Sequence, residues 1–185
     1  MPTRHPARRT AQPATRAPAR PAGAAAQLPP AGERGERYWL MKSEPDTFGI
    51  AHLARQGVAP WDGMRNYQSR NNIRTMAVGD LVLFYHSNAT PSGVAGIAQV
   101  ARAAYPDHTS WDASSHYFDP KSSPDNPRWS MVDVRYVSTF PRLLPLDALR
   151  SVPELSSMLL FRNSRLSVIG VSPQHYQIIL RLAAS

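Results

Sequence analysis

One short apolar run places the strongest limit on how this chain can fold. Residues 81–85 (LVLFY) follow the turn Gly79-Asp80 and end at His86, and their only polar group is the tyrosine hydroxyl. A run of this length between polar boundaries is typical of a strand that is buried on both faces of a sheet. We therefore expect a sheet in which this strand is covered on both sides.

The remaining patterns intersperse strands with helices. Residues 131–140 alternate apolar and polar positions, which predicts a half-buried strand. A C-terminal helix is predicted after an N-cap at Ser172, with Pro173 in its first position. No βαβ unit recurs at even spacing, so we expect an α+β fold around a mostly antiparallel, curved sheet. The other predicted elements are strands at 38–42 and 93–104, an extended segment at 165–171, helices at 46–56, 66–76 and 146–149, a turn at 60–63, and a mostly irregular stretch at 105–130.

Two of the helices carry a predicted buried stripe. The apolar positions recur at the spacing of one helix face, which is the pattern of an amphipathic helix against a core. The stripe of the helix predicted at 66–76 comprises Tyr67, Ile73 and Met76. That of the C-terminal helix comprises Tyr176, Ile179, Leu180 and Ala183.

The first 36 residues have a different composition from the rest. They are nearly all Ala, Pro and Arg, and residues 1–37 hold seven arginines and two glutamates. Such a segment cannot bury enough apolar surface to offset its ordering entropy, so we expect a disordered tail at 1–36 and one domain at 37–185. Much of the net charge of +8 lies in the tail, so the charge does not by itself predict a basic face on the domain. The alternatives for the tail are a solvated extension, a start codon assigned too far upstream, a non-specific phosphate contact and an organellar transit peptide.

Several classes of site are excluded or disfavoured. The 185-residue chain has no cysteine, which excludes disulfides, a thiol nucleophile and a thiolate metal site. Its apolar runs are far shorter than the roughly 20 residues of a membrane span, and no phosphate loop of the G-x-x-x-x-G-K-[ST] type is present. His108 and His116, with Asp112 or Asp119, lie in a predicted loop without the helical spacing of metal ligands. We therefore expect no cofactor, no bound metal and no membrane partner.

Polar residues gather where the apolar segments end. Lys42-Ser43-Glu44 follows the first predicted strand, and His86-Ser87 follows the buried run. Each such residue has a structural explanation on its own, since Trp61 can pack in the core and Asn66 can cap a helix. Together, however, rings, amides, hydroxyls and cations are the groups that stack on a base, read its edge and hold the neighbouring phosphates.

A base-binding role makes one geometric demand. Ring faces and short polar groups from separate parts of the chain must converge on a single cavity sized for a flat heterocycle. We expect Trp61, Asn66 and Tyr85 around that cavity.

Two catalytic arrangements would use the same residues. Ser43 or Ser87 would form a nucleophilic triad with His86 and either Asp62 or Glu44. No G-x-S-x-G elbow is present, however, and Ser87 directly follows His86, so their side chains would diverge on a strand. Glu44 with Asp46 or Asp62 would form an acid–base pair, yet nothing in the spacing singles out either pair. We therefore expect a protein that is not an enzyme, with a hydrolase-type activity as the alternative.

The same stretches resemble the EVE domain family over about residues 37–182. The segments with the most specific resemblance are WDGMRNYQSRN at 61–71 and FYHS at 84–87. Met41, Met64 and Ile169-Gly170 depart from the family pattern without touching the polar set. Further matching segments are YWLMKSEPDTF at 38–48, the remainder of 61–87, VAGIAQVARAAYPD at 94–107, HYFDPKS at 116–122, PRWSMVDV at 127–134 and RLSV at 165–168.

The resemblance implies a PUA-like fold, a small curved β-barrel with flanking helices that is related to the YTH readers of methylated adenine in RNA. It also implies a non-catalytic module that recognises a modified base, either modified cytosine in DNA or modified RNA, in a pocket lined by these segments. The residues implied for base and nucleic-acid contact are Trp39, Lys42, Ser43, Glu44, Trp61, Asp62, Arg65, Asn66, Tyr67, Arg70, Phe84, Tyr85, His86, Ser87, Arg165, Leu166 and Ser167.

The energetics of a methyl group limit selectivity. One buried methyl contributes only about 0.8 kcal/mol, roughly a fourfold preference, so strong selection needs a polar group that pairs with the right base or is left unpaired by the wrong one. We therefore expect an oxidised or otherwise polar modification on a nucleic acid, bound by a monomer in the cytoplasm, or in the nucleus or an organelle of a eukaryote. The alternatives are a nucleotide- or nucleoside-binding protein, a small-molecule enzyme that uses the same cavity, and a general RNA-binding protein that ignores modification.

Overall fold

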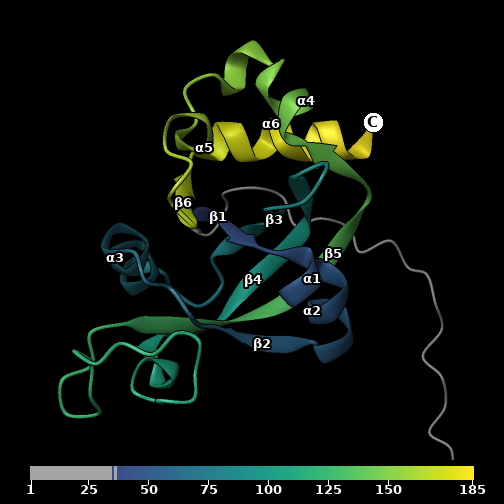
Figure 1. Ribbon diagram of the computed structural model, residues 1–185. Helices are drawn as coiled ribbons and strands as arrows, with labels where there is room; N and C mark the ends of the chain where they lie inside the picture. The colour runs from purple at the N-terminus through teal and green to yellow at the C-terminus, as the bar shows by residue number, and fades with distance from the viewer. Residues whose placement is uncertain (1–34, 36) are drawn as a thin grey trace, which may run out of the picture.

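Six strands form one curved sheet in the order β2-β5-β4-β3-β1-β6 (Figure 1). The computed structural model describes residue 35 and residues 37–185. Neighbouring strands are antiparallel except β1 and β3, which are parallel. The predicted α+β fold with a mostly antiparallel sheet is therefore confirmed. The strands are β1 (Tyr38–Ser43), β2 (Val58–Trp61), β3 (Leu81–His86), β4 (Gly93–Pro106), β5 (Ser130–Pro145) and β6 (Val168–Val171).

Helices flank the sheet at the four positions that the sequence indicates, and at Leu159–Arg162, where none is predicted. The helix predicted at 46–56 is split into α1 (Pro45–Phe48) and α2 (Ile50–Gln56), because Gly49 between them has an extended backbone, with φ −93° and ψ 172°. The remaining helices are α3 (Tyr67–Thr75), α4 (Leu146–Arg150), α5 (Leu159–Arg162) and α6 (Pro173–Ala184), with short 3₁₀ turns at His108–Ser110 and Pro153–Leu155.

The sheet separates two apolar layers, and strand alternation assigns each residue to one of them. In β3, Leu81, Leu83 and Tyr85 face one layer, which also holds the buried side of α6. Val82 and Phe84 face the other layer, which holds Trp61 and the inner residues of α2 and α3. Residues 81–85 are all buried, as the apolar run predicts. The buried stripe of α6 and its Ser172 cap, whose hydroxyl accepts from the His175 N–H at 3.2 Å, are also confirmed.

Helix α3 bridges the two ends of the sheet. The Asn72 side chain donates to the Val168 carbonyl of β6 at 2.8 Å, and Arg74 Nε donates to the Ser130 hydroxyl at the start of β5 at 2.9 Å. The helix therefore spans the side on which the curved sheet is open, between edge strand β6 and the β5 side.

Two local predictions are wrong. Pro60 and Trp61, expected in a turn, end strand β2, where an edge position tolerates the missing N–H of proline. Tyr67, expected in the buried stripe of α3, is 51% exposed, because it begins the helix and stacks outward on Trp129.

The predicted disorder of residues 1–36 falls outside the described residues, apart from Gly35, so it stays a prediction. Among the described residues, none of the helices has both the length and the apolar character needed to cross a membrane.

Candidate functional site

Two of the predicted polar clusters lie side by side at the ends of parallel strands. The β1–β3 pairing sets Lys42 beside Tyr85 and Ser43 beside His86. The Ser87 N–H then donates to the Ser43 carbonyl at 2.9 Å. Glu44, just beyond, is exposed and accepts from the Asn88 side chain at 2.6 Å. Because parallel strands end at the same edge of a sheet, segments more than 40 residues apart meet here.

The 165–167 segment joins the same edge through backbone bonds. The Lys42 N–H donates to the Ser167 carbonyl at 2.8 Å, and the Ser167 N–H donates to the Ser69 hydroxyl of α3 at 3.2 Å. The Lys42 ammonium reaches the Ser164 carbonyl at 3.1 Å, and burial lowers the pKa of this lysine. Exposed Arg165 lies between Ser164 and the buried Leu166.

Three of the expected residues do not join the others. Tyr85 faces the opposite layer of the sheet, where its hydroxyl bonds with Ser92 at 3.1 Å, and Leu166 is buried in that same layer. Trp39 lies toward the other end of the strands, and its indole donates to Asp80 at 2.9 Å. The expected convergence of Trp61, Asn66 and Tyr85 on one cavity is therefore wrong for Tyr85, because alternation along β3 turns it away from Phe84 and His86.

A cluster of rings lies on the face that carries Phe84. Trp61 meets Phe84 edge to face at 5.1 Å between ring centres, and Phe48 of α1 meets Trp61 in the same way at 6.1 Å. His86 packs its edge on Phe84 at 5.7 Å. Trp61 is only 4% exposed, whereas Phe48 is half-buried. We call Phe48, Trp61, Phe84 and His86 the ring cluster.

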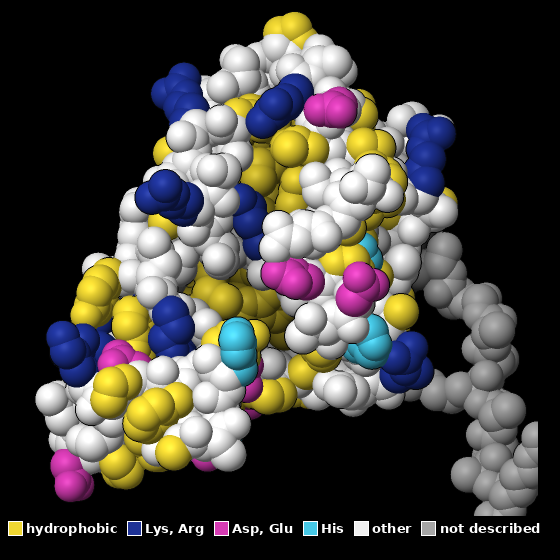
Figure 2. Space-filling model, in the orientation of Figure 1, with side chains coloured by type: hydrophobic (Ala, Val, Ile, Leu, Met, Phe, Trp, Pro, Cys, Tyr) yellow, Lys and Arg dark blue, Asp and Glu magenta, His cyan; other side chains and the backbone are white. Residues whose placement is uncertain are grey.

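The surface is hollowed between α3 and α1. Figure 2 shows a recess there with an apolar floor, with Lys and Arg side chains on the α3 side and Asp and Glu side chains on the α1 side. Arg70 and Arg74 belong to α3, Asp46 belongs to α1, and Glu44 is the residue that precedes α1. Lys42 is on the other face of β1, where its ammonium lies 5.9 Å from the ring centre of Tyr85. A flat group entering this recess would meet apolar surface below and charges of both signs at the rim.

His86 is a neutral acceptor in this arrangement. Its Nε2 accepts the Ile50 N–H at 3.1 Å, and burial lowers its pKa. Nearby, Nδ1 of His52 accepts the Gly49 N–H at 2.9 Å. The two imidazoles thus satisfy the backbone at the start of α2 and fix α1 and α2 against the end of β3.

Arg65 is tied into a structural junction with the segment after β4. Its guanidinium pairs with Asp107 at 2.7 Å and also donates to the Tyr117 carbonyl at 2.7 Å. Asp107 in addition accepts hydrogen bonds from the Gly63 N–H and from the backbone N–H and the hydroxyl of Thr109. Burial alone would raise the pKa of Asp107, but the hydrogen bonds from Arg65 and Thr109 outweigh it and hold the pKa below its usual value.

Gly63 is required at this junction. Its φ is +74°, and a Cβ there would lie 2.7 Å from the ring of Tyr117. Asn66 caps α3, which is one of the two roles predicted for it, since its side-chain oxygen accepts the Ser69 N–H at 3.0 Å. Gly63 and Asn66 therefore both fix the local backbone of the WDGMRN segment.

Asp62 has a different environment from Asp107. Its pKa is raised, mainly by burial and in addition by the negative charge of Asp107. The charges of His108 and Arg65 oppose the rise but are smaller effects. Among the described residues, the Asp62 side chain forms no ion pair and accepts no hydrogen bond from another residue. It is a half-buried carboxyl, next to Trp61, with capacity to bind a donor.

An outer layer of rings and cations covers the start of α3. Tyr67 stacks on Trp129 with ring centres 4.9 Å apart, and the Arg70 guanidinium lies 4.7 Å from the Tyr67 ring centre. Sequence reasoning missed Trp129 and Asp107 as parts of the site. The signal was present, because both occur in segments that match the family pattern, but nothing in their spacing places them beside residues 61–71.

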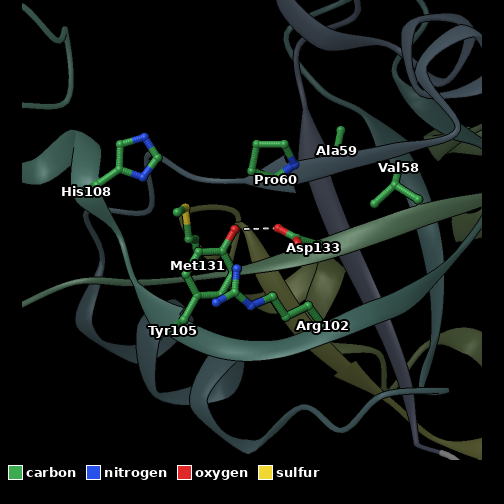
Figure 3. A pocket seen from close by; sticks show the side chains of 8 residues that line it. All are labelled: Val58, Ala59, Pro60, Arg102, Tyr105, His108, Met131 and Asp133. Carbon is green, nitrogen blue, oxygen red and sulfur yellow. Dashed lines mark hydrogen bonds between the residues drawn. The ribbon is translucent and has the colours of Figure 1, made fainter.

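Two further hollows lie away from the ring cluster. One, of about 480 Å³, lies over β2, β4 and β5 (Figure 3), and no predicted site residue lines it. There the Tyr105 hydroxyl donates to Asp133, and the Arg102 guanidinium stacks 3.8 Å from the Tyr105 ring centre. The other, of about 260 Å³, is lined in part by Trp39. Among the described residues, no group of three His, Asp or Glu side chains is placed to hold a metal ion.

Comparison with known proteins adds an independent line of evidence. The EVE domain model matches residues 37–182. The chain is 39% identical to human thymocyte nuclear protein 1 over 164 residues, which cover 78% of this chain and 73% of that protein. It resembles the crystal structure of human THYN1 protein in complex with 5-methylcytosine containing DNA, with 38% identity, a TM-score of 0.78, and coverage of 81% of this chain and 99% of that one. A hypothetical protein from Leishmania major is 52% identical, with a TM-score of 0.79 and coverage of 80% and 95%.

Proposed function

Because the chain belongs to the EVE domain family, we propose that it is a non-catalytic module that binds DNA and reads a modified cytosine. The observation that carries the proposal is its similarity to human THYN1, whose structure is a complex with 5-methylcytosine containing DNA. The recess between α3 and α1, with its ring cluster and mixed charges, supports the same role.

In this proposal, the recess holds a base that has left its stack. Extruding a base from a duplex costs a few kcal/mol, and stacking on aromatic groups returns about 1–3 kcal/mol per base. The ring cluster supplies that surface through half-buried Phe48, since Trp61 and Phe84 are themselves almost fully covered. Polar contacts must then supply the remaining affinity.

We assign the reading of the cytosine edge to Asp62. A carboxylate accepts from the N4 amino group of cytosine, which is the donor that distinguishes this base. The raised pKa of Asp62 and its lack of a partner in the described part of the chain fit a group that is held for a ligand. Ser43, Ser87 and Ser167, which lie together at the ends of β1 and β3, form the rest of the proposed polar wall. Arg65 and Asn66 contribute to binding by holding the rim in place.

The test is a titration with duplex oligonucleotides that carry cytosine or 5-methylcytosine at one position. We expect a preference of roughly fourfold for the methylated duplex, from about 0.8 kcal/mol per buried methyl. Asp62→Asn should weaken binding to both duplexes by about tenfold or more, since one good edge contact is worth about 1–3 kcal/mol. Asp112→Asn, which changes an exposed carboxylate that accepts only from Ser114, is the matched control and should bind normally.

Two outcomes would contradict the proposal. Equal affinity of Asp62→Asn and the unchanged protein would remove Asp62 from the site. Stabilisation against heat by free nucleosides, with none by oligonucleotides, would instead favour a metabolite-binding protein.

A further inference from the structure

Three arginines converge beside the recess, and among the described residues only one carboxylate, that of Asp119, pairs with any of them. Arg70 and Arg74 lie one turn apart on α3, and both donate to the carbonyl of Arg128, at 3.1 and 3.4 Å. Arg128 in turn donates to the hydroxyl of Tyr67 at 3.1 Å. Shared bonds to one carbonyl and one hydroxyl therefore hold three guanidinium groups close to one another.

The local charge balance is strongly positive. Among the described residues, Arg70 and Arg74 form no ion pair, and Arg128 meets only Asp119, at 3.9 Å. Burial, and then repulsion from Arg74 and Arg128, lower the pKa of Arg70. Clustered like charges oppose one another, so a fixed arrangement of this kind is suited to an anion that neutralises them.

An exposed ring is fixed among these cations. Tyr67 is 51% exposed, yet one of its faces stacks on the buried Trp129, at an interplanar angle of 27°. Trp129 is itself held by its indole N–H, which donates to Asp119 at 2.7 Å. The ring is thus presented in one orientation, which lowers the entropy lost when a ligand packs against it.

We propose that Tyr67, Arg70, Arg74 and Arg128 form a contact surface for the sugar–phosphate backbone of the DNA strand that flanks the base in the recess. The guanidinium groups would hold phosphates, and the tyrosine ring would pack on the adjoining nucleotide. This inference rests on the proposed function, because the surface begins only five residues after Asp62 and shares α3 with the wall of the recess. It adds Arg74, Arg128 and a structural role for Trp129 to the residues expected to contact the strand.

The test measures affinity for the same two duplexes at several salt concentrations between about 50 and 200 mM. Replacing Arg74 and Arg128 together by Gln should reduce the slope of log affinity against log salt by about one for each lost phosphate contact. At the lowest salt, the affinity for both duplexes should fall by at least about tenfold, with their ratio unchanged. Arg181→Gln, an exposed arginine of α6, is the matched control and should keep the original slope.

The outcomes separate this inference from the proposed function. An unchanged salt slope in the folded double variant overturns the proposed contact with the DNA backbone. The anion that this surface binds would then be one other than DNA, for example an acidic peptide. A protein that binds both duplexes equally, but with a slope that falls in the variant, contradicts the base-reading proposal and supports the surface. If the double variant melts early, exposed Arg74→Gln alone should still lower the slope by about one.

Discussion

Asp62 and Asp107 are neighbouring carboxylates with opposite environments, and the contrast separates structure from binding. Asp107 accepts from Arg65, Gly63 and Thr109, and its pKa is lowered. Asp62 has no such donors, and its pKa is raised, in part by the charge of Asp107 itself. A carboxylate whose hydrogen bonds are satisfied stabilises the fold, whereas one held in a half-buried position without a partner costs stability and has capacity for a ligand.

The same contrast extends to the two regions around these residues. The junction of Arg65 and Asp107 anchors the segment after β4, and each of its polar groups has a protein partner. The recess between α3 and α1 combines an apolar floor with charges of both signs at its rim (Figure 2). We therefore expect substitutions in the junction to act mainly on stability and substitutions at the recess to act mainly on affinity.

The largest expected effect is on stability, from Asp107→Ala. Removing this fully buried carboxylate leaves the guanidinium of Arg65, whose side chain is 22% exposed, without its ion pair. Breaking such a pair by deleting one partner costs about 3–5 kcal/mol, and urea unfolding followed by tryptophan fluorescence would measure the loss. Asp112→Ala is the control and should change the free energy of unfolding by less than about 0.5 kcal/mol. A stable Asp107→Ala protein would mean that the junction does not anchor the rim.

An intermediate effect is expected from Trp61→Phe, at a position where stability and affinity are linked. Trp61→Ala empties a position that is 4% exposed and should cost about 3–5 kcal/mol, so a loss of DNA binding in this variant would not identify a contact. Trp61→Phe keeps an aromatic edge against Phe84 and should cost roughly 2 kcal/mol, with affinity for the methylated duplex changed only a few-fold. A folded Trp61→Phe protein that has lost binding would show that the indole itself touches the base.

The fold was largely predictable because its signals are local. The apolar run at 81–85 and the capped helix after Ser172 each depend on neighbouring residues, and both form as predicted. The turn expected at 60–63 failed because the pairing of Pro60 with Asp133 is a long-range event that local turn propensity does not report.

The candidate site was predictable only in part, and for a different reason. Strand order brings Ser43 beside His86, and the sequence indicates both as strand ends. Whether a residue faces the recess depends on which layer its strand position meets, and this separates Phe84 from its neighbour Tyr85. The partner of Arg65 lies 42 residues away, so sequence alone could not distinguish a ligand-binding arginine from a structural one.

The smallest expected effect, and the sharpest comparison, comes from pH. His86 has a lowered pKa in the folded protein and accepts from Ile50, so the folded state resists protonation that the unfolded state undergoes near the usual pKa of 6.5. The unfolded chain then binds more protons, and the free energy of unfolding should be constant above about pH 6.5 and fall as the pH drops below it. Asp107, whose lowered pKa starts from a usual value of 3.8, loses its contribution only in more acidic solution. At about pH 5, therefore, protonation should weaken the ring cluster while leaving the junction intact.

Urea unfolding of the unchanged protein and of His86→Gln at about pH 7.5 and pH 5 would measure this loss of stability, with exposed His116→Gln as the control. The Gln variant should lose less stability on acidification than the other two, and equal losses in all three would show that His86 does not report on the ring cluster.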